Sequence, residues 1–118
     1  MSLVARYLES NNIPTVIIGS AKDIVEQCGV PRFIFTDFPL GNPVGIPYNT
    51  NMQIEITKMA LTLLEKAKYP RTSIQTPFTW HNHEWRETYM EVNESNRELL
   101  ARTGKIRRAR QTKRKYPN

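Results

Sequence analysis

The chain has 118 residues, a formal net charge of +6 and a single cysteine. This length allows one domain with a modest core, and no run of about 18 apolar residues is present to form a membrane span. Arg6 and Glu9 interrupt the first apolar stretch, so no signal peptide is expected. The lone Cys28 has no partner for an internal disulfide. We therefore expect a cytoplasmic protein without membrane association.

The positive charge is concentrated near the C-terminus. Seven basic residues and no acidic residue lie between Lys105 and Lys115, which leaves ten basic against eleven acidic residues in 1–104. This tail is expected to be solvated or to dock on another subunit, and nucleic acid is its other candidate partner. Apart from Tyr116 it lacks the aromatic side chains that stack on bases, so nucleic acid is the less favoured partner.

The first part of the chain alternates helix and strand patterns. Apolar residues at helical spacing predict a helix that ends at Asn11-Asn12. The β-branched and aromatic runs TVIIG (15–19) and RFIFT (32–36) predict two buried strands. Two strands joined by a helix are expected to be parallel, with a right-handed crossover. The predicted fold class is therefore α/β, a small Rossmann-like unit with the order helix-strand-helix-strand-helix and a C-terminal helical extension.

The turn GSAKD follows the first predicted strand. Ser20 and Asp23 have the spacing of a capping box, which predicts the start of a helix, and Gly29 predicts its end. Because this turn lies at the carboxyl end of a strand, a ligand-binding role for Ser20 remains open beside the capping role. Cys28 falls at the far end of the helix, away from the helix start that favours a reactive thiolate, and is expected to be structural.

A loop rich in proline and glycine follows the second predicted strand. Three prolines and two glycines lie between Pro39 and Pro47, within the stretch FTDFPLGNPVGIPYN. This loop, 37–49, and the GSAKD turn are expected to frame one crevice at the carboxyl edge of the sheet, where glycine lets the backbone approach a ligand closely. The candidate substrate-binding residues are Gly19, Ser20, Asp37, Phe38, Leu40, Gly41 and Asn42.

The remaining elements are expected to be helical. Thr50 with Gln53 forms a second capping-box pattern, and an apolar stripe at 3.6-residue spacing predicts a helix that ends at Tyr69-Pro70. Residues 70–80 are turn-rich and are expected to form a surface loop. A last helix or helix pair, marked by Trp85, Tyr89 and Val92, is expected to reach about Arg102 and to be closed by Gly104. The expected organisation is an α/β unit at 1–69, a tryptophan-containing extension at 70–104 and a basic tail at 105–118.

The motif WHNHEW places His81 and His83 between two tryptophans. Two histidines separated by one residue can bind a metal from a strand, but no third ligand stands at a recognisable spacing, so no metal site is expected. The tryptophans are expected to clamp this segment onto a core or a partner. The two histidines remain weak candidates for acid–base catalysis.

The stretches ARYLESNNIPTVIIGS and VPRFIFTDFPLGNPVG resemble the C-terminal region of the selenoprotein B component of glycine, sarcosine and betaine reductases. The resemblance covers roughly residues 3–67, and PLGNP at Pro39–Pro43 is its most specific part. It implies reductive cleavage of a carbon–heteroatom bond in a small carboxylate-bearing substrate by a selenocysteine or cysteine. The segment that carries this nucleophile precedes the region in the family and is not matched by Cys28. Phe38 stands where the family often has the histidine of P-H-P-L-G.

Two predicted strands cannot form a stable open sheet by themselves. Either another chain completes the sheet or the chain dimerises through its strands, and completion by a partner chain is the expectation. Together with the resemblance, this implies that the chain is a subunit of a bacterial, cytoplasmic hetero-oligomer, an oxidoreductase or lyase, and that it does not itself carry the nucleophile. A second catalytic subunit would supply the cysteine or selenocysteine, and a thioredoxin-like protein would supply the electrons. No cofactor is expected in this chain. The alternatives are a nucleic-acid-binding protein that uses the basic tail and a regulatory, homo-oligomeric small-molecule-binding domain.

Overall fold

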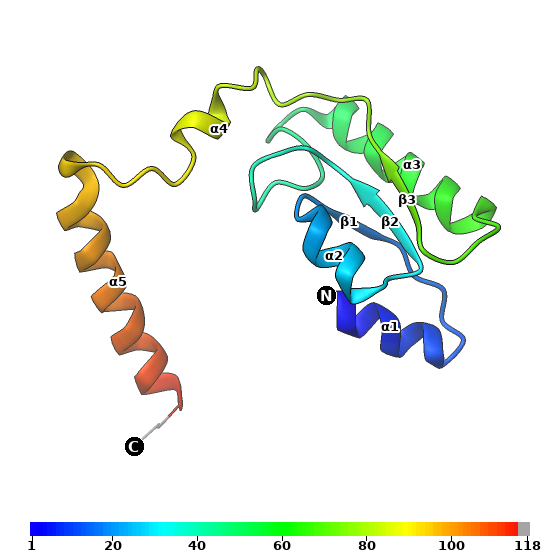
Figure 1. The fold of residues 1–118 in the computed structure, drawn as a ribbon, viewed down its shortest axis with the longest axis horizontal. Coiled ribbons are helices and arrows are strands. Elements are labelled where there is room, and N and C mark those ends of the chain that lie inside the picture. Colours follow the sequence, from blue (N-terminus) through cyan, green and yellow to red (C-terminus); the bar gives the residue numbers. More distant parts are fainter. Residues whose placement is uncertain (116–118) are drawn as a thin grey trace. The chain divides into compact units, whose positions relative to one another are not determined.

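The computed structural model describes residues 1–115, apart from the side chains of Lys113 and Lys115. The chain divides into two compact units, Met1–Arg86 and Glu87–Asn118. Its elements in chain order are α1 (Ser2–Ser10), β1 (Ile17–Gly19), α2 (Lys22–Cys28), β2 (Arg32–Phe35), α3 (Thr50–Lys66), β3 (Thr72–Gln75), α4 (Trp85–Thr88) and α5 (Glu94–Lys115) (Figure 1).

The first unit is built on a three-stranded parallel sheet in the order β1-β2-β3. The predicted α/β class and both predicted strands are confirmed. The surface loop expected at 70–80 is partly wrong, because Thr72–Gln75 pairs in register with Arg32–Phe35. This strand has one apolar residue, Ile74, and therefore gives no apolar run in the sequence; it forms because its backbone groups pair with those of β2.

Each face of the sheet has its own core. One face packs against α2, and its core consists of Ile17, Val25, Val30, Phe33 and Phe35. The opposite face packs against α3, and its core includes Ile18, Ile34, Met59, Ala60 and Leu63. The unit therefore has three layers, with the sheet between α2 and α3.

The two crossover connections differ in hand. Both advance in the same direction along the sheet, from β1 to β2 and from β2 to β3. Because their helices cover opposite faces, one connection is right-handed and the other is left-handed. A left-handed crossover is rare in parallel sheets.

The helix ends differ in part from the capping patterns of the sequence. Gly29 ends α2 in the left-handed conformation, with φ of 72°, as predicted. The Ser20–Asp23 capping box is wrong: the N-cap of α2 is Ala21, and no side chain caps it. Ser20 Oγ instead lies 3.4 Å from the hydroxyl oxygen of Thr36, one residue beyond the neighbouring strand.

The start of α3 is capped by Asn49 rather than by Thr50. The Asn49 side chain accepts a hydrogen bond from the Met52 amide at 3.1 Å. Gln53 does not close a capping box, because its side-chain amide donates to the Ile46 carbonyl oxygen at 3.1 Å. The predicted apolar stripe of this helix is confirmed, and three of its residues are buried: Ile56, Ala60 and Leu63.

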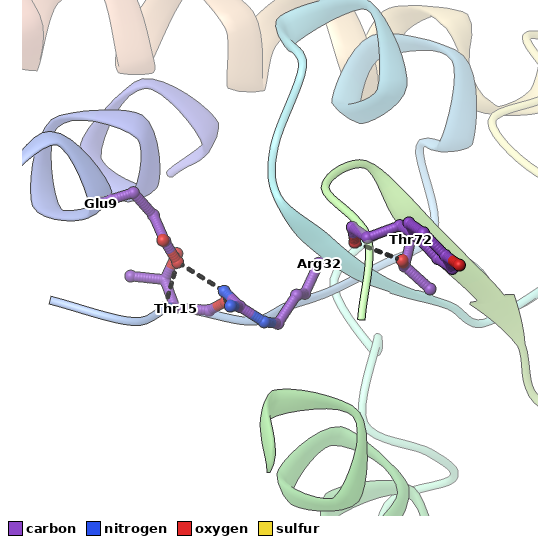
Figure 2. A network of polar contacts seen from close by, with 5 residues as sticks. Glu9, Thr15, Arg32 and Thr72 are labelled. Carbon is purple, nitrogen blue, oxygen red and sulfur yellow. Dashed lines mark hydrogen bonds and ion pairs between the residues drawn. The ribbon is translucent and has the colours of Figure 1, made fainter. Parts of the chain in front are cut away.

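A polar network ties α1 to the sheet (Figure 2). Glu9 Oε1 accepts hydrogen bonds from the Thr15 amide and hydroxyl and forms an ion pair with Arg32 Nη1 at 2.8 Å. The same Arg32 nitrogen lies 3.3 Å from the Thr15 carbonyl oxygen. The end of α1, the residues before β1 and the start of β2 are thereby held together.

The second unit is dominated by α5. This helix continues through Gly104 to Lys115, so the predicted end at Gly104 is wrong. A glycine inside a helix costs only about 1 kcal/mol relative to alanine, and strong helix formers surround this one. Of the helix or helix pair predicted from Trp85, the structure has the pair, α4 and α5, with Tyr89 and Val92 in the segment between them. Residues 116–118, the end of the expected basic tail, lie outside the described residues.

Candidate site at the carboxyl edge of the sheet

The residues that follow the three strands are all hydroxyl-bearing: Ser20, Thr36 and Thr76. The Thr36 amide donates to the Gly19 carbonyl oxygen and the Thr76 amide to the Phe35 carbonyl oxygen, each at 3.0 Å. These bonds extend the parallel ladder by one residue. The three hydroxyl side chains therefore form one row across the carboxyl edge of the sheet.

The hydroxyl row is poorly satisfied for its burial. Thr36 is 0% exposed and Thr76 is 4% exposed. Among the residues that the structure describes, Thr36 Oγ1 makes only long contacts, at 3.4 Å, to Ser20 Oγ and to the Gly19 carbonyl oxygen. Within the described part of the chain, Thr76 Oγ1 has no hydrogen-bond partner. Leaving such a group unpaired costs about 1–3 kcal/mol, so this edge has unused hydrogen-bonding capacity.

A charged cluster stands beside this row. Arg86 Nη2 donates to the carboxylate of Asp37, the residue after Thr36. Arg86 Nη1 lies 2.6 Å from His83 Nδ1, so His83 accepts on this nitrogen and carries its proton on Nε2. The guanidinium also lies over the Trp85 ring, 4.9 Å from its centroid. Asp37 and His83, far apart in the sequence, are thus brought to one cation.

The proline-rich loop begins with a buried anchor. Phe38 is 2% exposed and packs on Trp80, with ring centroids 5.6 Å apart. His81 is exposed and lies edge-on to the same tryptophan ring. Phe38 is therefore a packing residue that Trp80 covers, which limits its role as a wall of a ligand site.

The rest of the loop is a chain of tight turns. Backbone hydrogen bonds join Asn42 to Pro39, Gly45 to Asn42 and Asn49 to Ile46, at 3.1–3.4 Å. These successive turns fix the path of the loop between β2 and α3 through its own backbone.

The predicted substrate-binding residues do not all lie together. Ser20 and Asp37 follow adjacent strands at the carboxyl edge. Gly19 lies within β1, where an added Cβ would come within 3.3 Å of the Phe33 ring. Leu40 is 58% exposed, and Gly41 beside it has open space on its Cβ side. Asn42 is half-buried in the turn that follows.

Three residues of the edge were not predicted: Thr36, Thr76 and Arg86. Thr36 is the last residue of the predicted strand RFIFT, and this position at the strand end could have assigned it to the carboxyl edge. Thr76 follows a strand that gives no apolar pattern, and Arg86 reaches Asp37 across 49 positions of sequence.

The chain's single thiol is remote from this edge. Cys28 ends α2, a helix that starts at the carboxyl end of β1 and returns to the amino end of β2. The Cys28 side chain is half-buried, and its carbonyl oxygen accepts a hydrogen bond from Arg6 Nη1 at 3.2 Å. The hydroxyl row and Cys28 thus occupy opposite ends of the sheet.

The described residues contain no helix that is long and apolar enough to cross a membrane. They also hold no group of three or more histidine, cysteine, aspartate or glutamate side chains arranged to bind a metal ion.

Comparison with known proteins finds a partial similarity to a reductase subunit. No family model matches the chain, and no solved structure matches it significantly. Among curated proteins, D-proline reductase subunit gamma of Acetoanaerobium sticklandii is 31% identical over 78 residues, which cover 66% of this chain and 32% of that protein. The match thus spans about a third of the relative's length. The chain is a distant homologue, over part of its length, of a reductase subunit.

Proposed function

We propose that the chain is a substrate-binding subunit of a multi-subunit reductase and that it binds a small organic molecule at the carboxyl edge of its sheet. One observation carries the proposal: a row of hydroxyls lies beside the Asp37–Arg86 cluster, and its Thr76 hydroxyl is buried without a hydrogen-bond partner among the described residues. Ligands of open parallel sheets bind at this edge. Because the only cysteine lies at the other end of the sheet, the reacting sulfur or selenium belongs to a partner chain.

The edge suits a small carboxylate-bearing substrate. Hydroxyl groups donate hydrogen bonds to a carboxylate, and a guanidinium binds it with two parallel hydrogen bonds. D-proline, which the homologue's name specifies, has such a carboxylate. In this role Arg86 exchanges its contact with Asp37 for one with the substrate carboxylate. The hydroxyl row then fixes the orientation of the substrate.

The partner performs the covalent chemistry in two steps. Its cysteine or selenocysteine attacks the substrate carbon, and the heteroatom leaves with the bonding electron pair and takes up a proton. A thiol pair on a thioredoxin-like donor then supplies two electrons, which break the bond between the carbon and the sulfur or selenium. The carbon takes up a proton, and the two donor thiols become a disulfide. The second catalytic subunit covers the carboxyl edge and completes the site in a cytoplasmic hetero-oligomer.

Reconstitution tests this proposal. The chain is co-expressed with the products of its neighbouring open reading frames, and dithiol-dependent consumption of D-proline is measured with L-proline as the control substrate. We expect a stable complex whose activity falls at least tenfold when this chain is omitted. A complex that is equally active without the chain, or the lack of any complex, contradicts the proposal.

The basic face of α5 supports a second candidate function, binding of a polyanion such as RNA. Arg107, Arg110 and Arg114 follow one another at intervals of three and four residues and line one hollow with Gln111. Fluorescence anisotropy with a labelled RNA duplex tests it. The triple change of these arginines to glutamine should weaken binding and flatten its salt dependence. Binding that the triple change leaves unaltered contradicts this candidate.

A further inference from the structure

The outer edge of β3 is open for pairing. Strand β3 is a terminal strand of the sheet. The amides of Thr72 and Thr76 donate toward β2, to the carbonyl oxygens of Pro31 and Phe35. In a strand, alternate residues direct their backbone groups to opposite sides, so Ser73 and Gln75 present theirs to the open edge. The strand TSIQ has none of the charged residues or prolines that usually prevent edge-to-edge pairing.

An apolar hollow adjoins this edge on the α3 side of the sheet. It has a volume of about 500 Å³, and its apolar lining includes Ile34, Met59, Leu63 and Ile74. Ile74 is 39% exposed, whereas Ile34 beside it on β2 is fully buried. The hollow therefore marks the place where α3 leaves the last strand uncovered.

We propose that this edge pairs with β3 of a second copy of the chain, antiparallel, around a two-fold axis. The outward backbone groups of Ser73 and Gln75 then bond to Gln75 and Ser73 of the copy. This register places Ile74 directly opposite Ile74 of the copy, in a pair that shares no backbone hydrogen bonds. Two three-stranded sheets become one sheet of six strands, and both Ile74 side chains are buried between the two hollows.

The same symmetry brings the two α3 helices to one face of the joined sheet. Each α3 packs on its own β2. The two helices are therefore separated by the three strand-to-strand spacings from β2 through both β3 strands to β2 of the copy, about 14 Å. Directly packed helices are about 8–10 Å apart, so long side chains must bridge the gap. Met59 and the hollow's rim residues Glu55 and Lys66 have the required reach.

The charges of this rim favour a second copy over an unrelated chain. Glu55 lies in the N-terminal half of α3, where it forms an exposed ion pair with Lys58 at 3.2 Å, and Lys66 is the last residue of the helix. A two-fold axis makes the helices antiparallel, so Glu55 of each copy faces Lys66 of the other. With Lys58, the rim of each copy carries one acidic and two basic residues. Each Glu55 is then shared between its own Lys58 and Lys66 of the copy, a contact that an isologous interface makes twice. The carboxyl edge stays free for the catalytic subunit, and the dimer does not depend on the proposed reductase role.

Disulfide trapping tests the register with the full chain in a Cys28→Ser background. Opposed residues of this kind have Cα atoms about 4.5 Å apart, within disulfide range, so Ile74→Cys should give a covalent dimer on oxidation. Gln75→Cys is the matched control. In this register Gln75 is opposite Ser73 of the copy, so the two Gln75 residues are diagonal neighbours about 7–8 Å apart. Equal trapping of both variants, or of neither, overturns the register.

A charge exchange tests the interface without added thiols. Light scattering of the wild-type protein should give twice the 13.8 kDa monomer mass. Glu55→Lys or Lys66→Glu should raise the dimer dissociation constant about tenfold, equivalent to about 1.4 kcal/mol, and the double exchange should restore it. Glu65→Lys, on the same helix but outside the hollow, should have no effect. A wild-type monomer at all concentrations, or pairing only with a different chain, overturns the proposal.

Discussion

The carboxylate of Glu9 lies 2.8 Å from the guanidinium of Arg32 and joins α1 to the first residue of β2 (Figure 2). Burial alone would raise the pKa of Glu9. Hydrogen bonds from the Thr15 amide and hydroxyl, together with the charge of Arg32, outweigh this effect and hold the pKa of Glu9 below its usual value. The network thus favours the ionised carboxylate in the folded state.

Glu9→Gln should lower the free energy of unfolding at pH 7 by about 1–2 kcal/mol, because the half-buried Arg32 loses its counter-charge. A carboxyl group whose pKa is lowered on folding stabilises the protein above its unfolded pKa. This contribution disappears as the pH falls through the folded pKa. The difference between wild type and variant should therefore be constant from pH 7 to about 5 and shrink below pH 4.5. Urea denaturation checks this, with the exposed Glu65→Gln as control.

Phe38→His introduces the histidine that the resembling reductases often have in this loop. Because Phe38 is 2% exposed and packs on Trp80, the change should lower the free energy of unfolding by about 2–3 kcal/mol. The loss should be larger at pH 5 than at pH 8, since a buried imidazole must be desolvated when charged. Leu40→His, two residues later at a largely exposed position, is the matched control. A loss no larger than that of the control would contradict the packing role of Phe38.

Alanine substitutions at Gly45 and Gly41 distinguish backbone strain from side-chain crowding in the proline-rich loop. Both have positive φ, at 121° and 100°, which side-chain-bearing residues rarely adopt. A Cβ on Gly45 would also lie 3.1 Å from Met52 Sδ, whereas one on Gly41 meets nothing within 4 Å. Gly41→Ala should therefore cost about 1 kcal/mol of unfolding free energy, and Gly45→Ala should cost more. Thermal unfolding of the two variants checks the order. Equal losses of unfolding free energy would mean that the Met52 side chain moves away from the added methyl group without cost.

The predictable part of the fold is the part with a strong apolar pattern. The runs around Ile17 and Phe33 and the stripe of α3 are buried elements whose patterns reflect their burial. Strand β3 was missed because Ile74 is its single apolar residue and its stability comes from backbone pairing with β2. Gly104 was expected to end a helix, but its neighbours favour helix strongly enough to pass through it.

The candidate site was predictable only where it follows the recognised strands. Ser20 and Asp37 were assigned to the carboxyl edge because each comes directly after an apolar run. Arg86 could not be assigned, because its contact with Asp37 depends on how residues 76–86 return over the sheet. The capping role considered for Ser20 failed for a related reason: its hydroxyl lies near Thr36 on the neighbouring strand, a contact that no local pattern encodes.

Thr76→Val distinguishes a binding role of the hydroxyl row from a purely structural one. The Thr76 hydroxyl is buried and, among the described residues, unpaired, so replacing it with a methyl group of similar shape should leave the free energy of unfolding unchanged or raise it by up to about 1 kcal/mol. If the hydroxyl binds substrate, the same change should raise the KM for D-proline in the reconstituted complex about tenfold, the loss of one hydrogen bond to a charged group. Thr79→Val, at an exposed position of the same segment, should alter neither quantity. A Thr76→Val protein that is less stable, with an unchanged KM, would show that the hydroxyl supports the fold and not the ligand.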